Sequence, residues 1–541
     1  MAVHRDGRFA ITHSIPMTSP PIAPQLVSRI REGYQLLKSR HPDAGEHALA
    51  LLRDHPDEPA VIVLAAEHFA NNADISRAIP LIEKALCLCN QDSFLKLKKA
   101  RFLGLARKMD AFIALLESIG EQAHSDPILL WQLGSLCYQN NLHHQAATYL
   151  AMAAEQLEPT PSLLYELAVT RHFCGDAQGA EKTLQTLLLV APSHGAALYL
   201  RACLMKQTPA SNHVQDLQER LEKHPSTQAD TAALLYALAK EHEDCSDFQR
   251  SYAALSQATR LKRGTYHYDA KQGVSALDAI RHAYTTDAIN AQTAGCSDAG
   301  PIFIVGMPRS GTTLCERLLT RTGLTSSAGE LHDFGNLLTT ACLAAQQDGE
   351  VDRAMASLSI DFQELGSRYV TAARAAAGGA PRFIDKMPTN FMFCGMIAKA
   401  LPNARIIHLV REPLANCYAI HKTHFFNAYG FACDQGELAE YFIAYRRLMQ
   451  HWHEVMPGKI LDVSYERLIE ATREETQHMY AWCDLQWSEG VLALPEPGAV
   501  FGTASAAQVR QPINTHSLHL VDNYTQQLSL LATRLASAQL L

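Results

Sequence analysis

The chain has 541 residues, enough for roughly three or four domains at about 150 residues each. Apolar residues make up 47% and charged residues 19%, which is the composition of a packed globular protein and excludes a largely disordered chain. The formal net charge is −8, which disfavours a protein that coats nucleic acid or an anionic membrane surface.

Neither apolar segments nor cysteines point to export or to a metal. No apolar run reaches the ~18–20 residues of a membrane-spanning helix, and the polar beginning of the sequence has no secretory apolar core. The 13 cysteines are scattered, without a C-x-x-C pair or zinc-ligand spacing. We therefore expect a reducing, cytoplasmic location, no membrane span, no nucleic-acid partner and no metal site.

The first half of the sequence carries an internal repeat. Residues 1–24 are proline-rich without periodicity and predict a flexible tail, whereas residues 25–270 are rich in alanine and leucine. Similar residues recur 34 positions apart, pairing Leu130 with Leu164, Gly134 with Ala168, and Ala146 with Ala180. Small residues at such positions let two antiparallel helices cross closely, and pairs of this kind stack into a solenoid. Residues 25–270 resemble tetratricopeptide repeats in about five to seven units, which implies either a surface for a peptide or protein partner or a rigid support.

A phosphate-binding loop opens the second half, after an expected linker at residues 271–299. Ile302–Val305 reads as a buried parallel strand, and a loop with the spacing Gly306-x-x-x-x-Gly311 leads into an amphipathic helix. Strand, loop and helix in this order direct backbone N–H groups at an anion. Thr312 stands where a nucleoside triphosphatase has lysine, and the cation, Arg309, lies inside the loop. The loop therefore suits a mixed anhydride better than ATP, with a P-loop kinase as an alternative.

The string Gly-x-Pro-Arg-Ser-Gly-Thr-Thr resembles the 5′-phosphosulfate loop of sulfotransferases that use 3′-phosphoadenosine 5′-phosphosulfate (PAPS). This variant is similar to tyrosylprotein sulfotransferases and to bacterial enzymes that join tetratricopeptide repeats to such a domain. The resemblance covers nearly the whole chain after residue 22. It implies an α-solenoid followed, in residues 300–541, by a P-loop-like three-layer α/β domain with a parallel sheet. The cofactor-binding residues that it implies in the loop are Gly306, Pro308, Arg309, Ser310, Gly311, Thr312 and Thr313.

The same resemblance assigns roles downstream of the loop. Glu330 takes the position of the catalytic base, and Lys386 in IDKMP is chosen as the cation near the bridging oxygen. Arg411, after the predicted strand 405–410, is implied to bind the 3′-phosphate, and Tyr465 is the aromatic residue near the cofactor.

A C-terminal segment, TASAAQVRQPI, resembles a lid over the active site. In this alignment Ser505 contacts the transferring sulfonate and Arg510 is the cation of the lid. The implied catalytic residues are thus Glu330, Lys386, Arg309 and Ser505. The sequence departs from the family where Ala419 replaces a serine eight residues after Arg411, with Lys422 nearby as a substitute.

The reaction that follows from this resemblance is in-line transfer of a sulfonate group to a hydroxyl, driven by positioning and charge stabilisation without a metal. The favoured acceptor is a peptide or protein tyrosine presented by the repeats, with carbohydrate and small-molecule hydroxyls left open. A homodimer is a further expectation. A repeat-based scaffold with a degenerate transferase domain is the alternative that Ala419 motivates.

Overall fold

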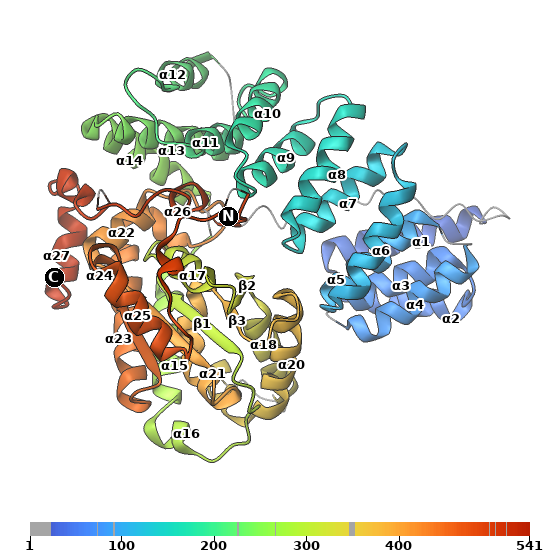
Figure 1. The fold of residues 1–541 in the computed structure, drawn as a ribbon. Coiled ribbons are helices and arrows are strands. Elements are labelled where there is room, and N and C mark those ends of the chain that lie inside the picture. The colour runs from blue at the N-terminus through green and yellow to red at the C-terminus, as the bar shows by residue number, and fades with distance from the viewer. Residues whose placement is uncertain are drawn as a thin grey trace. The chain divides into compact units, whose positions relative to one another are not determined.

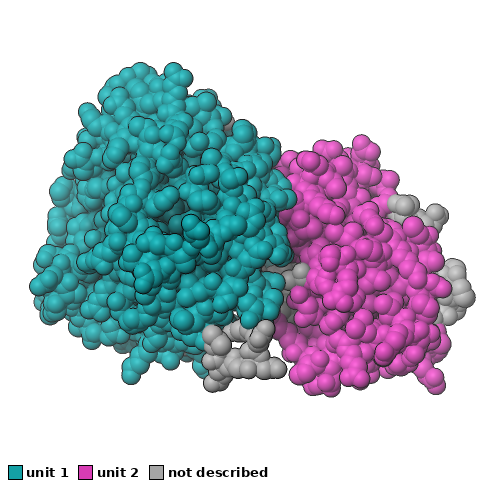
Figure 2. Space-filling model, turned by 90° about the horizontal axis from the view of Figure 1, so that it is seen from below, with its two compact units in different colours: residues 1–2, 159–541 teal, residues 3–158 magenta. Residues whose placement is uncertain are grey.

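Figure 1 shows a computed structural model of the chain, which describes residues 23–541 apart from 73, 90–91, 224–226, 266, 346–351, 497, 504 and 516. Contacts divide the chain into two compact units that meet in the sequence at residues 158 and 159, coloured separately in Figure 2. The predicted tail lies, for residues 1–22, outside the described residues.

The N-terminal unit is helical throughout its described elements. Its helices are α1 Pro24–Ser39, α2 Ala44–Asp54, α3 Pro59–Asn71, α4 Ile75–Leu88, α5 Ser93–Leu105, α6 Met109–Gln122, α7 Pro127–Gln139 and α8 His143–Gln156. Several begin with proline, which suits the first helical position because its missing N–H has no partner there. At the crossing of α7 and α8, a Cβ on Gly134 would lie 2.6 Å from Leu150, so the predicted close approach is confirmed.

The helix pairs follow a constant period. The first helices of four successive pairs, α3, α5, α7 and α9 (Pro161–Phe173), each begin 34 residues after the previous one. The second helices, α4, α6, α8 and α10 (Ala177–Val190), keep the same spacing. The helical first half predicted from sequence is confirmed, and the regular period is consistent with tetratricopeptide repeats.

The C-terminal unit continues with helices before its sheet begins. After α9 and α10 these are α11 Gly195–Cys203, α12 Val214–Lys223, α13 Gln228–Asp244, α14 Phe248–Gly264, α15 Ala270–Ala283 and α16 Thr286–Asn290. The segment expected as a linker therefore contains two helices. The segment is anchored because Leu277 is buried and Tyr284 meets Trp452 edge-on at 5.9 Å between ring centroids.

Five strands form one parallel sheet in the order β2-β3-β1-β4-β5. They are β1 Pro301–Gly306, β2 Ser326–Gly329, β3 Phe383–Asp385, β4 Arg405–Val410 and β5 Ile460–Ser464. The central strand β1 lies between β3 and β4, so its carboxyl end faces the point where the chain crosses from one side of the sheet to the other. Parallel α/β sheets bind ligands at such points.

Side chains along β1 alternate between two helical layers. Ile302 and Ile304 belong to an apolar core that includes residues of α17 (Thr312–Thr320), α24 (Tyr465–Glu470) and α25 (Thr472–Trp482). On the other face Phe303 stacks on Tyr369 with ring centroids 5.4 Å apart and meets Phe334 edge-on. These two residues come from α20 (Phe362–Ala376) and α18 (Asp333–Ala345). The predicted three-layer α/β domain with a parallel sheet is confirmed.

The remaining helices of this unit are α19 Arg353–Ala356, α21 Cys394–Ala400, α22 Pro413–His421, α23 Gln435–Val455, α26 Ala506–Val509 and α27 Ser529–Ser537. Among the described residues, none of the helices combines the length and the apolar character needed to cross a bilayer.

Candidate active site

The predicted phosphate loop joins β1 to α17 at the central strand. Gly306, Arg309 and Gly311 have positive φ values of 146°, 65° and 104°. A Cβ on Gly306 would lie 2.8 Å from the carbonyl oxygen of Leu409, and one on Gly311 would lie 2.4 Å from the ring of Tyr465. Both positions therefore require glycine, for backbone conformation and for space.

The loop offers unused donors at the start of α17. Ser310 is 1% exposed, and its hydroxyl has no hydrogen-bond partner among the described residues. Thr312 and Thr313, which begin α17, are 5% exposed each. A buried hydroxyl without a partner costs free energy unless a ligand supplies one, and a helix N-terminus attracts an anion. This set of groups fits a phosphate ester.

A C-terminal lid, which we define as residues 499–518, closes over the loop. Arg309 donates through Nη1 to the hydroxyl oxygen of Ser505 and through Nη2 to Oε1 of Gln508 at 2.9 Å. The hydroxyl oxygens of Thr313 and Thr503 lie 3.3 Å apart. The structure thus brings together the predicted residues Arg309 and Ser505, and it adds two lid residues that the sequence did not reveal.

Glu330 and Lys386, predicted as base and cation, form an ion pair. The Lys386 backbone N–H donates to the carbonyl oxygen of Gly329 at 2.9 Å, which holds the ends of β2 and β3 together. Burial favours a lower pKa for Lys386, but the carboxylates of Glu330 and Glu316 raise its pKa above the ordinary value. Burial also favours a higher pKa for Glu330, and the charge of Lys386 outweighs it and lowers that pKa. Both groups are therefore charged.

A second carboxylate, missed by the sequence analysis, approaches the same ammonium. Glu316 of α17 is 7% exposed, and its Oε2 lies 3.9 Å from Nζ of Lys386. Its Oε1 accepts a hydrogen bond from the hydroxyl of Ser327 at 2.5 Å. No spacing in the sequence marks this residue, because its two partners come from the ends of other strands.

Asp385 connects the two segments that carry the ion pair. Its Oδ1 accepts from the backbone N–H of Leu331 at 3.4 Å and of Met387 at 3.1 Å. Its Oδ2 accepts from the hydroxyl of Tyr369 at 2.7 Å and the amide of Asn390 at 3.1 Å. Burial raises the pKa of Asp385 to about 7, although these hydrogen bonds favour the ionised form. One buried carboxyl therefore positions the residues that follow Glu330 and Lys386.

Arg411 and Tyr465, predicted to bind the nucleotide, lie on the opposite side of the loop. The guanidinium of Arg411 stacks 4.5 Å from the ring centroid of Tyr465. It donates to the carbonyl oxygens of Arg309 at 3.0 Å and Ser517 at 3.1 Å. The hydroxyl groups of Tyr465 and Ser517 are 2.9 Å apart. Ser517, which the sequence analysis did not single out, therefore ties the lid to both predicted residues.

Two residues of α22 complete this side. The side-chain amide of Asn416 donates to the carbonyl oxygen of Pro308 at 3.0 Å and fixes the loop. Ala419 is buried, and Lys422, expected as a substitute cation, pairs instead with Glu243 of α13. That ion pair directs the side chain of Lys422 toward helix α13.

Arg510, predicted as the cation of the lid, serves to anchor the lid segment. Its guanidinium donates to the carbonyl oxygens of Phe173 at 2.5 Å, Ala499 at 3.0 Å and Ala506 at 3.0 Å. These contacts join the lid to the end of α9. Its hydrogen-bond partners are thus backbone carbonyl groups of the lid and of helix α9.

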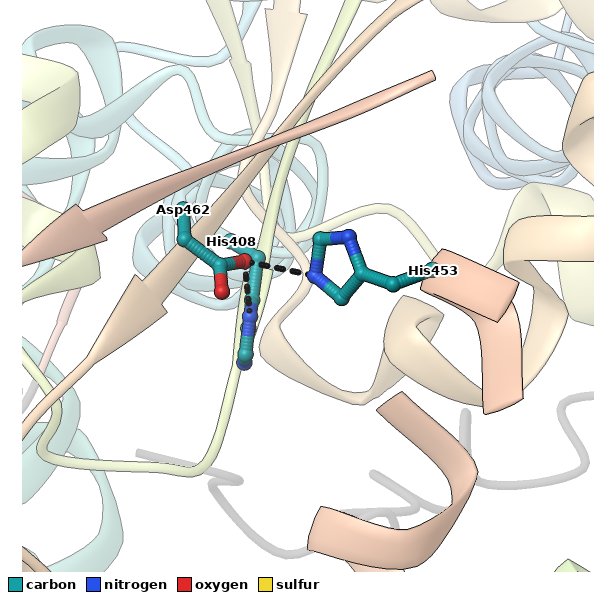
Figure 3. A group of neighbouring side chains, drawn as sticks. All are labelled: His408, His453 and Asp462. Atoms are coloured by element: carbon teal, nitrogen blue, oxygen red, sulfur yellow. Dashed lines mark hydrogen bonds and ion pairs between the residues drawn. The ribbon is translucent and has the colours of Figure 1, made fainter. Parts of the chain in front are cut away.

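A hydrogen-bonded network links β4 and β5 to the phosphate loop. His408 of β4 and Asp462 of β5 are paired in register, and Figure 3 shows both His408 and His453 directed at Asp462. The two imidazoles hydrogen-bond the same carboxylate oxygen at 2.8 and 2.9 Å. Nε2 of His408 contacts the hydroxyl of Tyr445, which also takes part in a hydrogen bond with the backbone of Met307 in the loop.

No sequence pattern indicates this His–Asp–His group, because its members come from β4, α23 and β5. The three candidate ligand atoms lie within 4.8 Å of one another, a spacing that would also admit a metal ion. Two hydrogen bonds to one carboxylate oxygen account for their convergence.

The site thus defines a parallel α/β domain with an anion-binding loop and a charged pair at the carboxyl end of its sheet. Residues 301–489 match the model of the sulfotransferase family. The C-terminal region of the chain therefore contains a sulfotransferase-family domain.

Two curated proteins are similar to this chain over part of its length. An uncharacterized protein of Aquifex aeolicus is 26% identical over 453 residues, which cover 81% of this chain and 59% of that protein. A putative protein-tyrosine sulfotransferase of Caenorhabditis briggsae is 29% identical over 224 residues, which cover 40% of this chain and 79% of that protein. The chain thus spans less than two thirds of the Aquifex relative.

Among solved structures, the sulfotransferase domain of the Synechococcus PCC 7002 olefin synthase is 17% identical and has a TM-score of 0.27. The alignment covers 43% of this chain and 97% of that domain.

Proposed function

We propose that the chain is a PAPS-dependent sulfotransferase that transfers a sulfonate group to an acceptor hydroxyl. The observation that carries the proposal is the Lys386–Glu330 ion pair in a family-matched domain whose phosphate loop keeps an unpaired buried hydroxyl at Ser310. A nucleoside triphosphatase would need a lysine at Thr312, and this chain has none there.

The residues on the loop side hold the donor. PAPS, when bound, supplies a sulfonate group activated by its link to the 5′-phosphate. Ser310 and the backbone N–H groups at the start of α17 hydrogen-bond that phosphate. Arg411, fixed by its stack on Tyr465, binds the 3′-phosphate, and Arg309 closes the lid through Ser505.

The residues on the other side act on charge and on the proton. Lys386 stabilises the negative charge that grows on the bridging oxygen, and Glu330 accepts the proton of the acceptor hydroxyl. In the present geometry the two neutralise each other. Movement of the ammonium from Glu330 toward the bridging oxygen removes that counter-charge, so the pKa of Glu330 rises toward the range useful for a base.

The favoured acceptor is a tyrosine of a peptide or protein. This choice is supported by the similarity to the putative protein-tyrosine sulfotransferase of Caenorhabditis briggsae and by the helical repeats, which provide a surface for a polypeptide. We further propose that the enzyme works in the cytoplasm.

The test is a transfer assay with purified full-length protein and PAPS labelled on sulfur. The acceptor panel contains tyrosine peptides, the same peptides with phenylalanine, and glycans. Labelling that depends on the tyrosine hydroxyl is expected. Labelling of glycans alone would overturn the acceptor assignment, and the absence of all transfer together with the absence of nucleotide binding would overturn the function.

A second function, a repeat-based scaffold with a degenerate transferase domain, is favoured by one observation. Ala419 lacks the expected hydroxyl, and Lys422 is held by Glu243. Loss of one hydrogen bond to a charged phosphate costs about 1.5–3 kcal/mol, which weakens nucleotide binding without abolishing it. A thermal-shift measurement with 3′-phosphoadenosine 5′-phosphate separates the two, since a scaffold would show no shift at millimolar nucleotide.

A further inference from the structure

The proposed mechanism leaves one buried charged group of the site without a role. Glu316 lies on the first helix after the phosphate loop and is 7% exposed. A carboxylate at such depth costs free energy unless it is paired and hydrogen-bonded. Its partners are Lys386, at 3.9 Å between Oε2 and Nζ, and the hydroxyl of Ser327, at 2.5 Å from Oε1.

Two carboxylates therefore face one ammonium from different elements. Glu330 approaches from the end of β2, and Glu316 approaches from α17. The side chain of Lys386 is 3% exposed and that of Glu330 is 35% exposed, whereas that of Glu316 is 10% exposed, so water screens the contact with Glu316 least. The ion pair with Glu330 is the closer of the two, which leaves Glu316 as a second partner at longer range.

Ser327 makes the position of Glu316 depend on the strand that carries Glu330. Its hydroxyl donates to Oε1 of Glu316 and accepts the backbone N–H of Gly329 at 2.9 Å. Gly329 immediately precedes Glu330. One serine thus sets the distance between the two carboxylates.

We propose that Glu316 is a positioning residue for Lys386, which keeps the ammonium in the site while the Lys386–Glu330 pair separates. This inference rests on the proposed function. When the ammonium moves toward the bridging oxygen, it leaves Glu330 free to take up a proton from the acceptor. Glu316 then remains as the buried counter-charge of Lys386, and a lysine without it would lose its own proton more readily.

The charged groups around Lys386 define the test. They are Glu316 of α17, Glu330 after β2 and Asp385 of β3, with His332 acting on Glu330. Glu316→Gln removes one of these charges while preserving the volume and an acceptor for Ser327. The control is Glu475→Gln, because Glu475 is also 7% exposed on a helix and pairs with Arg467 at 2.5 Å.

The experiment measures binding of 3′-phosphoadenosine 5′-phosphate by calorimetry from neutral pH to about pH 10.5, which requires no acceptor. The wild type should keep its affinity to the end of this range, because two carboxylates raise the pKa of Lys386 above its ordinary value. In Glu316→Gln the midpoint, which is the pH at which affinity has declined by half, should fall by about 1–3 units and so enter the range, because a nearby opposite charge shifts a pKa by that amount. Glu475→Gln and Glu316→Asp should keep the wild-type affinity throughout, the latter because the charge is retained.

An unchanged midpoint in a folded Glu316→Gln protein would overturn the inference, as would an equal loss of affinity at every pH. If Glu316→Gln does not fold, Ser327→Ala carries the test, with Glu316→Asp as its control. Ser327→Ala should lower the midpoint. Equal pH profiles of affinity in Ser327→Ala, Glu316→Asp and the wild type would overturn the inference. A wild-type protein that binds no nucleotide at neutral pH would instead contradict the proposed function and, with it, this inference.

Discussion

Tyr465 lies against the backbone of Gly311, so close that a Cβ on the glycine would be 2.4 Å from the tyrosine Cδ2. The same ring supports the guanidinium of Arg411 at 4.5 Å and reaches Ser517 of the lid at 2.9 Å through its hydroxyl. One side chain thus connects the phosphate loop, the arginine proposed to bind the 3′-phosphate, and the lid. A displacement of this ring would disturb all three.

Gly311→Ala should therefore weaken nucleotide binding. The added methyl group must displace Tyr465 and with it the guanidinium of Arg411, and loss of one hydrogen bond to a charged phosphate costs about 1.5–3 kcal/mol, or about 10–150-fold in affinity. Calorimetry with 3′-phosphoadenosine 5′-phosphate measures it. The control is Gly323→Ala, since Gly323 also has a positive φ, 71°, but no atom within 4 Å of the added carbon. Equal affinities of the two variants would contradict the steric argument.

Glu330→Gln should separate binding from transfer. The amide cannot accept the proton of an acceptor hydroxyl, while the loop and Arg411 are untouched. Transfer of labelled sulfonate should fall by about 10²–10³, and nucleotide affinity should stay near that of the wild type. Glu440→Gln, which alters an exposed pair with Arg534, serves as the control. A Glu330→Gln protein that transfers at the wild-type rate would remove Glu330 from the role of base.

Arg309 joins the phosphate loop to the lid through its hydrogen bonds to Ser505 and Gln508, and Glu330 has no such role. Arg309→Ala is accordingly expected to lose nucleotide binding and transfer together. The same calorimetric and transfer measurements compare it with Glu330→Gln. Retained nucleotide affinity in Arg309→Ala would show that the guanidinium does not contribute to the donor site.

From the raised pKa of Asp385 we predict a specific pH dependence of the protein's stability. Its pKa is raised from 3.8 to about 7 in the folded protein, so between these values the folded state binds more protons than the unfolded state. The free energy of unfolding therefore falls as the pH rises from about 4 to about 7 and levels off above. A shift of about 3 units corresponds to about 4 kcal/mol.

Asp385→Asn lacks this titration. Between pH 4 and pH 7 the wild type should lose about 4 kcal/mol of stability that the variant does not lose. Urea unfolding of both proteins at a series of pH values measures this difference. Parallel pH curves would show that the hydrogen bonds from Tyr369 and Asn390 hold the pKa of Asp385 near its ordinary value.

The parts of the site that the sequence predicted are those encoded by contiguous residues. The loop from Gly306 to Gly311 could be identified because strand, glycines and helix follow one another, and its positive φ values occur inside that segment. About five to seven repeat units are predicted from the sequence, but residues match at the 34-residue spacing only between two of them, whereas the helix boundaries show that period in four successive pairs. Many different side chains can fill the same helix crossing, so the period persists where the residues differ.

What the sequence could not predict depends on contacts between distant segments. Glu316 and Asp385 act through partners on other elements, and Ser517 returns to Tyr465 only through the path of the lid. Lys422, named as a substitute for the missing hydroxyl at Ala419, is instead bound by Glu243, 179 residues earlier in the chain. Residue type alone does not show which of two available partners a long side chain chooses.

Ala419→Ser should increase affinity for the nucleotide. If the position faces the 3′-phosphate, as the family resemblance implies, the added hydroxyl supplies a hydrogen bond to a charged group worth about 1.5–3 kcal/mol, or about 10–150-fold in affinity. Calorimetry should show this gain with 3′-phosphoadenosine 5′-phosphate and little gain with adenosine 5′-phosphate, which lacks the 3′ group. An equal effect on both nucleotides would place the 3′-phosphate elsewhere.

The carboxylate of Glu243 joins helix α13 to residues that follow the sheet strand β4. Its carboxylate on α13 accepts hydrogen bonds from the hydroxyl groups of Tyr418 at 2.5 Å and Tyr524 at 3.1 Å, and it pairs with Lys422. Glu243 is 11% exposed and Lys422 is 26% exposed, so the pair is largely but not fully shielded from water. Glu243→Gln leaves the ammonium without its counter-charge and should destabilise the protein by about 2–4 kcal/mol, somewhat less than the loss of a fully buried pair.

Urea unfolding followed by tryptophan fluorescence measures this loss. The control is Glu219→Gln, because Glu219 forms an exposed pair with Lys223 one helical turn away and its loss should leave stability nearly unchanged. If Glu243→Gln is no less stable than Glu219→Gln, the contacts of Tyr418 and Tyr524 are sufficient without the charge. If Glu243→Gln is less stable than the wild type by about 2–4 kcal/mol, the ion pair between Glu243 and Lys422 helps to hold α13 against α22.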